Sequence, residues 1–328
     1  MGDIFKAISA GFASFVFAWL TPSLVTVGIF VIFLWPEVRT ASPFRPVSHV
    51  AGANATAAAL VFAFSVVVLA VTFAYASLPI YRILEGYSLP RFLRRPLLRR
   101  QQREFARVRD AERRYAATGK MPAGIGIEDF RRFPEKPSAV RATSLGNALA
   151  AMESWGSERY NLDTLLMWHE LYGVSRDNVR RDTDEGRAPV DFFVSSIAHM
   201  TLLFAGCVVI AALIPQARIR ALVIAAVALL VVPASYRLAV KNMVDWAQSV
   251  KAMVNLGRAD LAEALGLRIP PGLEGERRMW LLHYWAVEQN QPRYIERYDK
   301  YRRSRPRGRS PDGPAVRGRS AVTPESDA

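Results

Sequence analysis

Residues 192–217 read FFVSSIAHMTLLFAGCVVIAALIPQA, a stretch without any Asp, Glu, Lys or Arg. A helix of this length crosses the hydrocarbon layer of a bilayer, which is about 30 Å thick. After a short polar connection, residues 221–236 are apolar again and read ALVIAAVALLVVPASY. This return stretch is short for a membrane, and we expect Arg237 and Lys241 beyond it to reach the headgroups with their long side chains. The sequence therefore predicts two membrane-spanning helices within residues 192–243.

Two more apolar stretches precede this pair and predict spans at Phe12–Trp35 and Ala57–Tyr81. The N-terminus lacks the pattern of a cleaved signal peptide, so the first span is expected to be retained. The connection between these spans contains three prolines and few charges, which predicts an irregular loop. Its Asn54-Ala55-Thr56 triplet matches a glycosylation acceptor, but it lies too close to the second span to favour that interpretation.

The distribution of positive charge predicts which ends of the spans are cytoplasmic. The 328 residues are 51% hydrophobic and carry a net charge of +14, with 43 Lys and Arg in total. Four of these lie in the two connections predicted outside, and the other 39 lie on the opposite side; the four are Arg39, Arg45, Arg218 and Arg220. Since Lys and Arg near the spans favour the cytoplasmic side, we predict a multi-pass inner (plasma) membrane protein with both termini in the cytoplasm.

These patterns together predict an all-α integral membrane protein with four transmembrane helices, arranged as two hairpins, and a helical cytoplasmic layer. Apolar residues recur at helical spacing from Met243 to Leu265, so the last span is expected to continue as one amphipathic helix up to Gly266. The predicted parts are a first transmembrane hairpin at 1–81, a basic helix at 82–119, a small helical region at 120–191, a second transmembrane hairpin at 192–243, C-terminal helices at 244–301 and a disordered basic tail at 302–328.

The segment after the first pair of spans is strongly basic, with eleven Arg and four acidic residues between Arg82 and Gly119. Residues 97–117 contain good helix formers and no Gly or Pro, which predicts a helix with a thin apolar stripe. Such a helix suits anionic lipid headgroups, or an acidic partner helix. Nucleic acid is the least favoured ligand, because aromatic residues are few and no recognition module is visible. The arginines assigned to the lipid surface are Arg94, Arg95, Arg99, Arg100 and Arg103.

The next segment is balanced in charge and predicts two helices after a loop at residues 124–137. Thr143 or Ser144 is suited to cap the first helix, and Asp163 is suited to cap the second. A further short helix is predicted around residues 276–290, which carry Trp280, Leu281, Tyr284 and Trp285.

The residues Thr143-Ser144-Leu145-Gly146-Asn147, Arg159-Tyr160-Asn161-Leu162-Asp163 and Trp168 resemble a pattern of uncharacterised bacterial membrane proteins, T-x-L-G-N, R-Y-G-x-D and then W. The tail of that pattern is similar to residues 246–252 and 261–266, followed by Pro270, Glu276-Arg277 and Trp280. The resemblance covers about the last 190 residues of the chain. It implies topology and domain limits but no mechanism, since that family has no known activity.

One departure from the pattern has a physical interpretation: Asn161 stands where the pattern has Gly. Asn tolerates the left-handed backbone conformation better than other non-glycine residues, so a tight turn survives there. The motif then favours a structural network of turns and caps. A ligand, partner or catalytic site is the alternative; the residues concerned are Asn147, Arg159, Tyr160, Asp163 and Trp168.

Within the predicted spans, His199 is the only ionisable side chain. It is expected either to be a neutral imidazole bonded to a Ser or Thr of a neighbouring helix, or to line a pore together with Ser195. The four histidines lie far apart and Cys207 is the only cysteine, so we predict no metal site and no cofactor. No phosphate-binding glycine loop or nucleophile motif is found, and an enzyme is therefore not expected.

The favoured hypothesis is a membrane-anchored scaffold or signalling component that presents its cytoplasmic helices to a protein partner and touches anionic lipid headgroups. The alternative is an oligomeric ion channel or pore lined by the third span. A homo-oligomer is expected in either case, because four spans enclose no aqueous route by themselves.

Overall fold

The computed structural model describes residues 13, 15–41 and 44–302, and all regular elements within these ranges are helices. An isolated bridge between Leu267 and Arg302 is the strand-like pairing found there. The predicted all-helical class is therefore confirmed. The chain divides into two compact units, residues 1–261 and 262–328. The predicted disordered tail lies, except for Arg302, outside the described residues.

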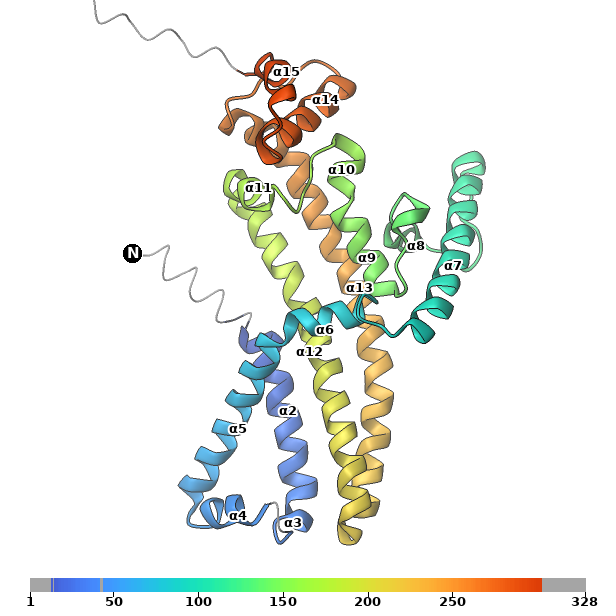
Figure 1. Cartoon of the computed structure of the whole chain (residues 1–328). Coiled ribbons are helices and arrows are strands. Elements are labelled where there is room, and N and C mark those ends of the chain that lie inside the picture. Colours follow the sequence, from blue (N-terminus) through green and yellow to red (C-terminus); the bar gives the residue numbers. More distant parts are fainter. Residues whose placement is uncertain (1–12, 14, 42–43, 303–328) are drawn as a thin grey trace, which may run out of the picture. The chain divides into compact units, whose positions relative to one another are not determined.

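Four helical stretches are long and apolar enough to cross a membrane, as the sequence predicted (Figure 1). The first, Val16–Val38, consists of η1 (Val16–Leu20), α2 (Thr21–Ile29), η2 (Phe30–Leu34) and α3 (Trp35–Val38). The second is α5 (Ala55–Tyr75) and the third is α12 (Asp177–Leu213). The fourth contains the 3-10 turn η5 (Pro215–Ala217) followed by α13 (Arg218–Ala264).

The bounds of two of these helices differ from the prediction. α5 ends at Tyr75, and after Ala76 the separate helix α6 (Ser77–Leu84) begins. Pro79 lies in the first turn of α6, where its missing N–H costs no helical hydrogen bond. α12 begins at Asp177, well before the apolar stretch, because the polar residues that precede the stretch continue the same helix.

Two segments expected to be irregular contain helices. The connection between the first two apolar helices includes α4 (Arg45–Ala51), with Pro46 in its first turn. The segment 124–137 includes α8 (Ile127–Arg132), whose Asp129 side chain accepts a hydrogen bond from the N–H of Gly126. In both segments the residues that favour the start of a helix are accompanied by few apolar residues. This local signal is too weak to predict a helix of six or seven residues.

Asn54 has a structural role. Its Oδ1 accepts a hydrogen bond of 2.7 Å from the N–H of Ala57 and caps α5. This satisfies one of the backbone donors that have no partner at a helix start.

The apolar helices pack through a buried cluster built mostly from α12 and α13. Leu203 and Cys207 of α12 lie against Ala221, Ala225 and Ala228 of α13, whose small side chains let the helices approach closely. Leu34 and Val38 of the first stretch join the same cluster. In α5, by contrast, the buried residues are Val66 and Ala70, so most of its surface is apolar and exposed.

A second buried cluster lies where α12 and α13 continue beyond their apolar stretches. There α9 (Ser144–Glu153) packs on both helices, with Leu145 and Ala148 against Val194 of α12 and Met243 of α13. The predicted extension of the fourth apolar stretch as one helix is confirmed, since α13 runs to Ala264 without a break.

The basic helix is α7 (Arg91–Thr118), which is longer than predicted and ends at the left-handed Gly119. Its inner face carries Phe105 and Val108, which pack with Phe133 and Val140. Three short elements complete this part of the first unit; they are η4 (Pro137–Ala139), α10 (Trp155–Tyr160) and α11 (Trp168–Val174).

The second unit contains α14 (Leu273–His283), η6 (Tyr284–Glu288), η7 (Pro292–Tyr294) and α15 (Ile295–Asp299). Trp280 is almost completely buried, and the hydroxyl of Tyr298 lies 3.1 Å from Nδ1 of His283. The helix predicted around residues 276–290 is thus confirmed. Gly266, with φ of +70°, follows the end of α13 as expected for a helix terminator.

The glycine in the 143–147 motif is explained by close packing. A Cβ atom at Gly146 would lie 2.3 Å from the backbone oxygen of Glu85, just after α6. We predict that Gly146→Ala lowers the free energy of unfolding by about 1–3 kcal/mol, as overpacking does. Unfolding of the purified protein in mixed micelles measures this. Gly173→Ala is the matched control, because a Cβ there meets nothing within 4 Å; equal losses for both variants would contradict the explanation.

Candidate functional site

The start of α9 is the point at which three helices of the first unit, α7, α9 and α13, meet. Thr143 caps the helix, and its Oγ1 accepts a 3.1 Å hydrogen bond from the N–H of Gly146. The N–H of Leu145 donates to the hydroxyl of Tyr236 on α13 over 3.2 Å. From α7, Gln101 donates to Oγ of Ser144 over 3.3 Å. These contacts fix α9 between α7 and α13.

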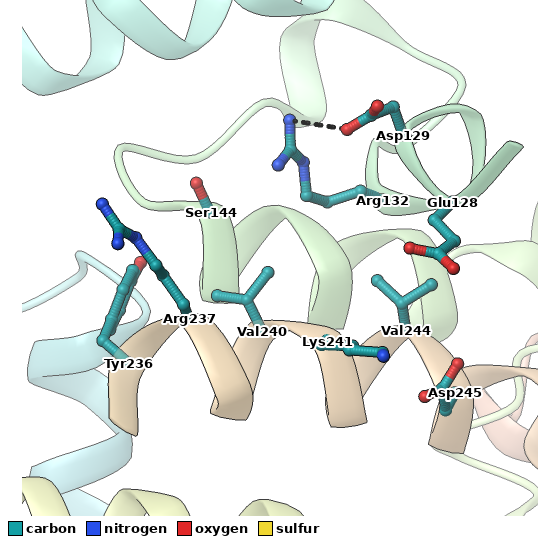
Figure 2. A pocket seen from close by; sticks show the side chains of 10 residues that line it. All are labelled: Glu128, Asp129, Arg132, Ser144, Tyr236, Arg237, Val240, Lys241, Val244 and Asp245. Atoms are coloured by element: carbon teal, nitrogen blue, oxygen red, sulfur yellow. Dashed lines mark ion pairs between the residues drawn. The ribbon is translucent and has the colours of Figure 1, made fainter. Parts of the chain in front are cut away.

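A cavity of about 290 Å³ opens beside this point, between α8, the first residue of α9 and one face of α13 (Figure 2). α13 supplies six of the ten lining residues, which are Tyr236, Arg237, Val240, Lys241, Val244 and Asp245. α8 supplies Glu128, Asp129 and Arg132, and Ser144 completes the lining. Val240 and Val244 are buried and form an apolar strip along the cavity.

The charged side chains of this cavity fall into two groups. Arg132 is already paired, because it lies 2.5 Å from Glu104 and 3.5 Å from Asp129. Four others are exposed, and none of their side chains makes an ion pair or hydrogen bond with another described residue; these are Glu128, Arg237, Lys241 and Asp245. Two cations and two carboxylates are therefore available to a charged ligand.

A second cavity, of about 400 Å³, lies on the α6–α7 side of α9 and is centred on Arg141. The guanidinium lies 2.7 Å from the carboxylate of Glu153, 3.7 Å from that of Glu85 and 4.7 Å from the centre of the Tyr87 ring. Burial raises the pKa of Glu85 above its ordinary value of 4.5, and the negative charge of Glu153 acts in the same direction, while Arg141 opposes both. The site is thus a partly buried network of one cation and two acids.

A short hydrogen bond joins α6 to α12 directly before the apolar stretch of α12. The hydroxyl of Tyr81 donates to Asp191 over 2.5 Å, and Arg187 lies 3.2 Å from the other oxygen of that carboxylate. Burial, followed by the charge of Asp191, raises the pKa of Tyr81 well above its ordinary value. The phenol therefore stays protonated and keeps its donor role at neutral pH.

The five residues of the sequence motif do not form one site. Asn147 is fully buried; its Oδ1 accepts from the N–H of Arg141 over 2.6 Å, and its Nδ2 donates to Gln101 over 2.9 Å and to the carbonyl of Arg141 over 3.2 Å. These hydrogen-bonding groups are used within the chain, which favours the structural interpretation. The same bonds hold Arg141 in the second cavity.

The other four motif residues lie between α10 and the first residue of α11. Arg159 pairs with Glu135 over 2.5 Å, and Tyr160 donates to Asn255 of α13 over 2.8 Å. Asp163 lines the second cavity and accepts from the N–H groups of residues 165 and 166 over 3.0 and 3.1 Å. Trp168 begins α11 and is half-buried. Asn161, with φ of +57°, adopts the left-handed conformation expected of it.

Ser195 and His199 lie within the apolar part of α12 and are fully buried. Nδ1 of His199 lies 2.8 Å from the carbonyl oxygen of Ser195, which can only accept, so Nδ1 carries the proton of a neutral imidazole. Nε2 lies 2.7 Å from the hydroxyl oxygen of Ser23 on α2, which also lies 2.9 Å from the carbonyl oxygen of Trp19. The imidazole also lies 4.3 Å from the ring centre of Phe73 on α5. His199 therefore joins three apolar helices, as the bonded-imidazole alternative predicted.

The five arginines assigned to a lipid surface are exposed, and within the described ranges none of them has an ion-pair partner. Arg95, Arg99, Arg100 and Arg103 lie away from the face of α7 that carries Phe105 and Val108. Arg94 differs, because it lines the second cavity.

Sequence reasoning missed the network of Glu85, Arg141 and Glu153, which come from three separate segments without a shared motif. It noted Arg237 and Lys241 as residues next to a span but not their position opposite α8. In the part of the chain that the structure describes, no three His, Cys, Asp or Glu side chains gather where a metal ion would be held.

Comparison with known proteins gave no relationship: no family model, curated protein or solved structure matches this chain. The functional argument therefore depends on the geometry described above.

The direction of the Glu85 pKa shift predicts a pH-dependent stability. A carboxyl group whose pKa is raised on folding stabilises the folded state below pH 4.5, and this contribution is lost as the pH rises through the folded pKa. We therefore expect Glu85→Gln to raise the unfolding temperature at pH 7.5 and to change it less at pH 4. Thermal unfolding at both pH values measures the difference. If the variant is less stable than the parent at pH 7.5 but not at pH 4, the ion pair of Glu85 with Arg141 outweighs the cost of burying the Glu85 carboxylate.

The contact between Ser23 and His199 predicts a moderate loss of stability. We expect Ser23→Ala to lower the free energy of unfolding by about 0.6–1.7 kcal/mol, the range measured for hydrogen bonds between membrane helices. Ser65→Ala is the control, because that hydroxyl donates to Val61 of its own helix. Unfolding in mixed micelles compares the two variants. A larger loss of unfolding free energy for Ser65→Ala would argue against a stabilising contact between Ser23 and His199.

Proposed function

We propose that this protein is an inner-membrane scaffold that holds a layer of helices at the cytoplasmic surface and presents α7 to an acidic partner. The observation that carries the proposal is a group of exposed arginines on the outer face of α7, Arg95, Arg99, Arg100 and Arg103, which have no ion-pair partner among the described residues, while the inner face of the helix is packed. A cationic surface held in a fixed position is suited to bind an acidic protein segment or anionic headgroups.

The orientation in the membrane is supported by the ends of the apolar helices. At one end, Glu37 of α3 pairs with Arg220 of α13 over 2.8 Å, and Ala217 joins the cluster of Leu34 and Val38. At the other end, α6 meets α12 through Tyr81 and Asp191. Two hairpins with both turns on the outer side fit these contacts. The excess of Lys and Arg at the second end supports a cytoplasmic location for that end under the positive-inside rule.

Homo-oligomerisation is part of the proposal. Most of α5 is exposed and apolar, including Leu60, Phe64 and Val67, and a cavity of about 590 Å³ lies between α2, α5 and α12. Lipid chains or a second copy of the chain would cover this surface.

The alternative of an oligomeric channel has weaker support. Ser195 and His199 are buried, and their polar atoms bond within the chain, so they are not available to line an aqueous path in this arrangement. The exposed residues on the apolar part of α12 include Leu202, Val208 and Val209, which offer no polar surface to ions.

A charge-neutralising pair of substitutions tests the scaffold. The partner is first identified by cross-linking in cells through a photoreactive residue at position 106 of α7. Its binding to the purified full-length protein in detergent is then measured without the cross-link. We expect Arg99→Gln with Arg103→Gln to weaken partner binding about 5–30-fold, since each exposed charge contact contributes about 0.5–1 kcal/mol. We also expect about 0.5 M salt to release the partner.

The matched control is Arg176→Gln with Arg181→Gln, which removes one exposed arginine directly before α12 and one within it. Equal binding by both double variants would contradict the proposal. So would ion flux through liposomes that contain only the purified protein, because it would favour the channel.

A further inference from the structure

We propose that the cavity between α8, α9 and α13 binds the headgroup of an aminophospholipid, with its phosphate at Arg237 and Lys241 and its primary ammonium at Glu128 and Asp245. The inference deepens the proposed function and rests on its membrane orientation. It assigns this cavity a ligand that differs from the anionic surface expected to meet α7.

The positive and negative charges that line the cavity are balanced. Two cations and two carboxylates line the same cavity, and their side chains make no ion pair or hydrogen bond within the described ranges. Arg132 is engaged by Glu104 and Asp129 and does not neutralise them. A ligand that carries both a negative and a positive group satisfies all four side chains, whereas a purely anionic ligand leaves the two carboxylates without a cation.

The charged side chains that α13 contributes follow one another along the helix in a definite order. Arg237 directly follows the apolar stretch, Lys241 lies one turn further, and Asp245 lies about 12 Å beyond Arg237 at 1.5 Å per residue. Figure 2 shows Arg237 at the Ser144 end of the cavity and Glu128 and Asp245 at the opposite end, with Lys241 between them and its ammonium group directed toward Asp245. In a bilayer the phosphate of a phospholipid lies next to the hydrocarbon and its amine lies further out. The order of charges in the cavity matches that arrangement.

Two hydroxyl groups, those of Ser144 and Tyr236, lie at the Arg237 end of the cavity. Oγ of Ser144 accepts from Gln101, and the hydroxyl oxygen of Tyr236 accepts from the N–H of Leu145. Each hydroxyl acts as an acceptor in these bonds, so its own O–H remains available to donate into the cavity. Phosphate oxygens are strong acceptors and suit two O–H donors beside a guanidinium.

The size and the lining of the cavity also fit a lipid headgroup. A volume of about 290 Å³ lies at the lower end of the range for small-molecule sites, about 300–1,000 Å³, and suits a headgroup rather than a whole lipid. Val240 and Val244 supply an apolar strip between the two charged ends, where the short carbon linker between phosphate and amine would lie.

The test is lipid binding to the full-length protein in detergent, measured by native mass spectrometry with lipids of identical acyl chains. We expect phosphatidylethanolamine to bind about tenfold more tightly than phosphatidylcholine, whose quaternary amine donates no N–H bond, and than phosphatidylglycerol, which has no cation. Arg237→Gln with Lys241→Gln should weaken all three lipids. Glu128→Gln with Asp245→Asn should remove the preference for phosphatidylethanolamine over phosphatidylglycerol.

Two control variants and one competitor sharpen the result. Arg181→Gln and Asp260→Asn remove exposed charges on α12 and α13 outside the cavity and should leave the preference unchanged. Water-soluble glycerophosphoethanolamine should compete with the lipid if the headgroup alone is bound. If only the intact lipid binds and the soluble headgroup fails to compete at millimolar concentration, recognition depends on the acyl chains and the headgroup assignment is overturned.

Failure of this inference can be distinguished from failure of the proposed function. A cysteine introduced by Ala117→Cys on α7, in a Cys207→Ala background, reports from which side of intact cells the layer can be labelled. If labelling places α7 in the cytoplasm but the three lipids bind equally, or if Arg237→Gln with Lys241→Gln changes nothing, the headgroup site is wrong and the scaffold stands. Labelling from outside overturns both.

Discussion

The first unit depends on the pairing of α12 with α13 along two successive buried clusters. In the apolar part, alanines of α13 lie against Leu203 and Cys207, and beyond it Met243 lies against Val194. Both helices continue past their apolar stretches. The buried cluster that contacts α9 is therefore formed by the same two helices, α12 and α13, as the cluster between the apolar stretches. The charged cavities are held in place by α9 and therefore by this pair, since α9 is fixed to α13 through Tyr236 and to α7 through Gln101.

Much of the fold could be predicted because its strongest signals are local. Long apolar stretches predicted the four helices, helical spacing from Met243 onward predicted the extension of α13, and the Thr143 capping contact followed from residue type. Asp163 accepts the expected hydrogen bonds but within a turn, and the helix predicted to start there begins only at Trp168. The errors fell where local signals are weak or ambiguous. The end of α5 was placed six residues too late because residues 76–81 are still apolar, and α8 was missed because a six-residue helix depends on tertiary contacts.

The candidate sites were less accessible to sequence reasoning, because they are made by contacts between distant segments. Glu85, Arg141 and Glu153 have no common spacing, and nothing in the sequence indicates that α8 faces α13 across a cavity. The motif around Asn147 attracted attention as a ligand site, yet its amide is used to hold Arg141 and Gln101. It thus contributes to the second cavity indirectly, by positioning the arginine at its centre.

The junction of Ser23, Phe73 and His199 has a consequence for how the chain is assembled. Its three members belong to helices that leave the ribosome at different times, and His199 follows Ser23 by 176 positions. This contact can form only after α12 has been synthesised. It then favours one register between the early and late helices, because a one-residue shift rotates the imidazole about 100° away from Ser23.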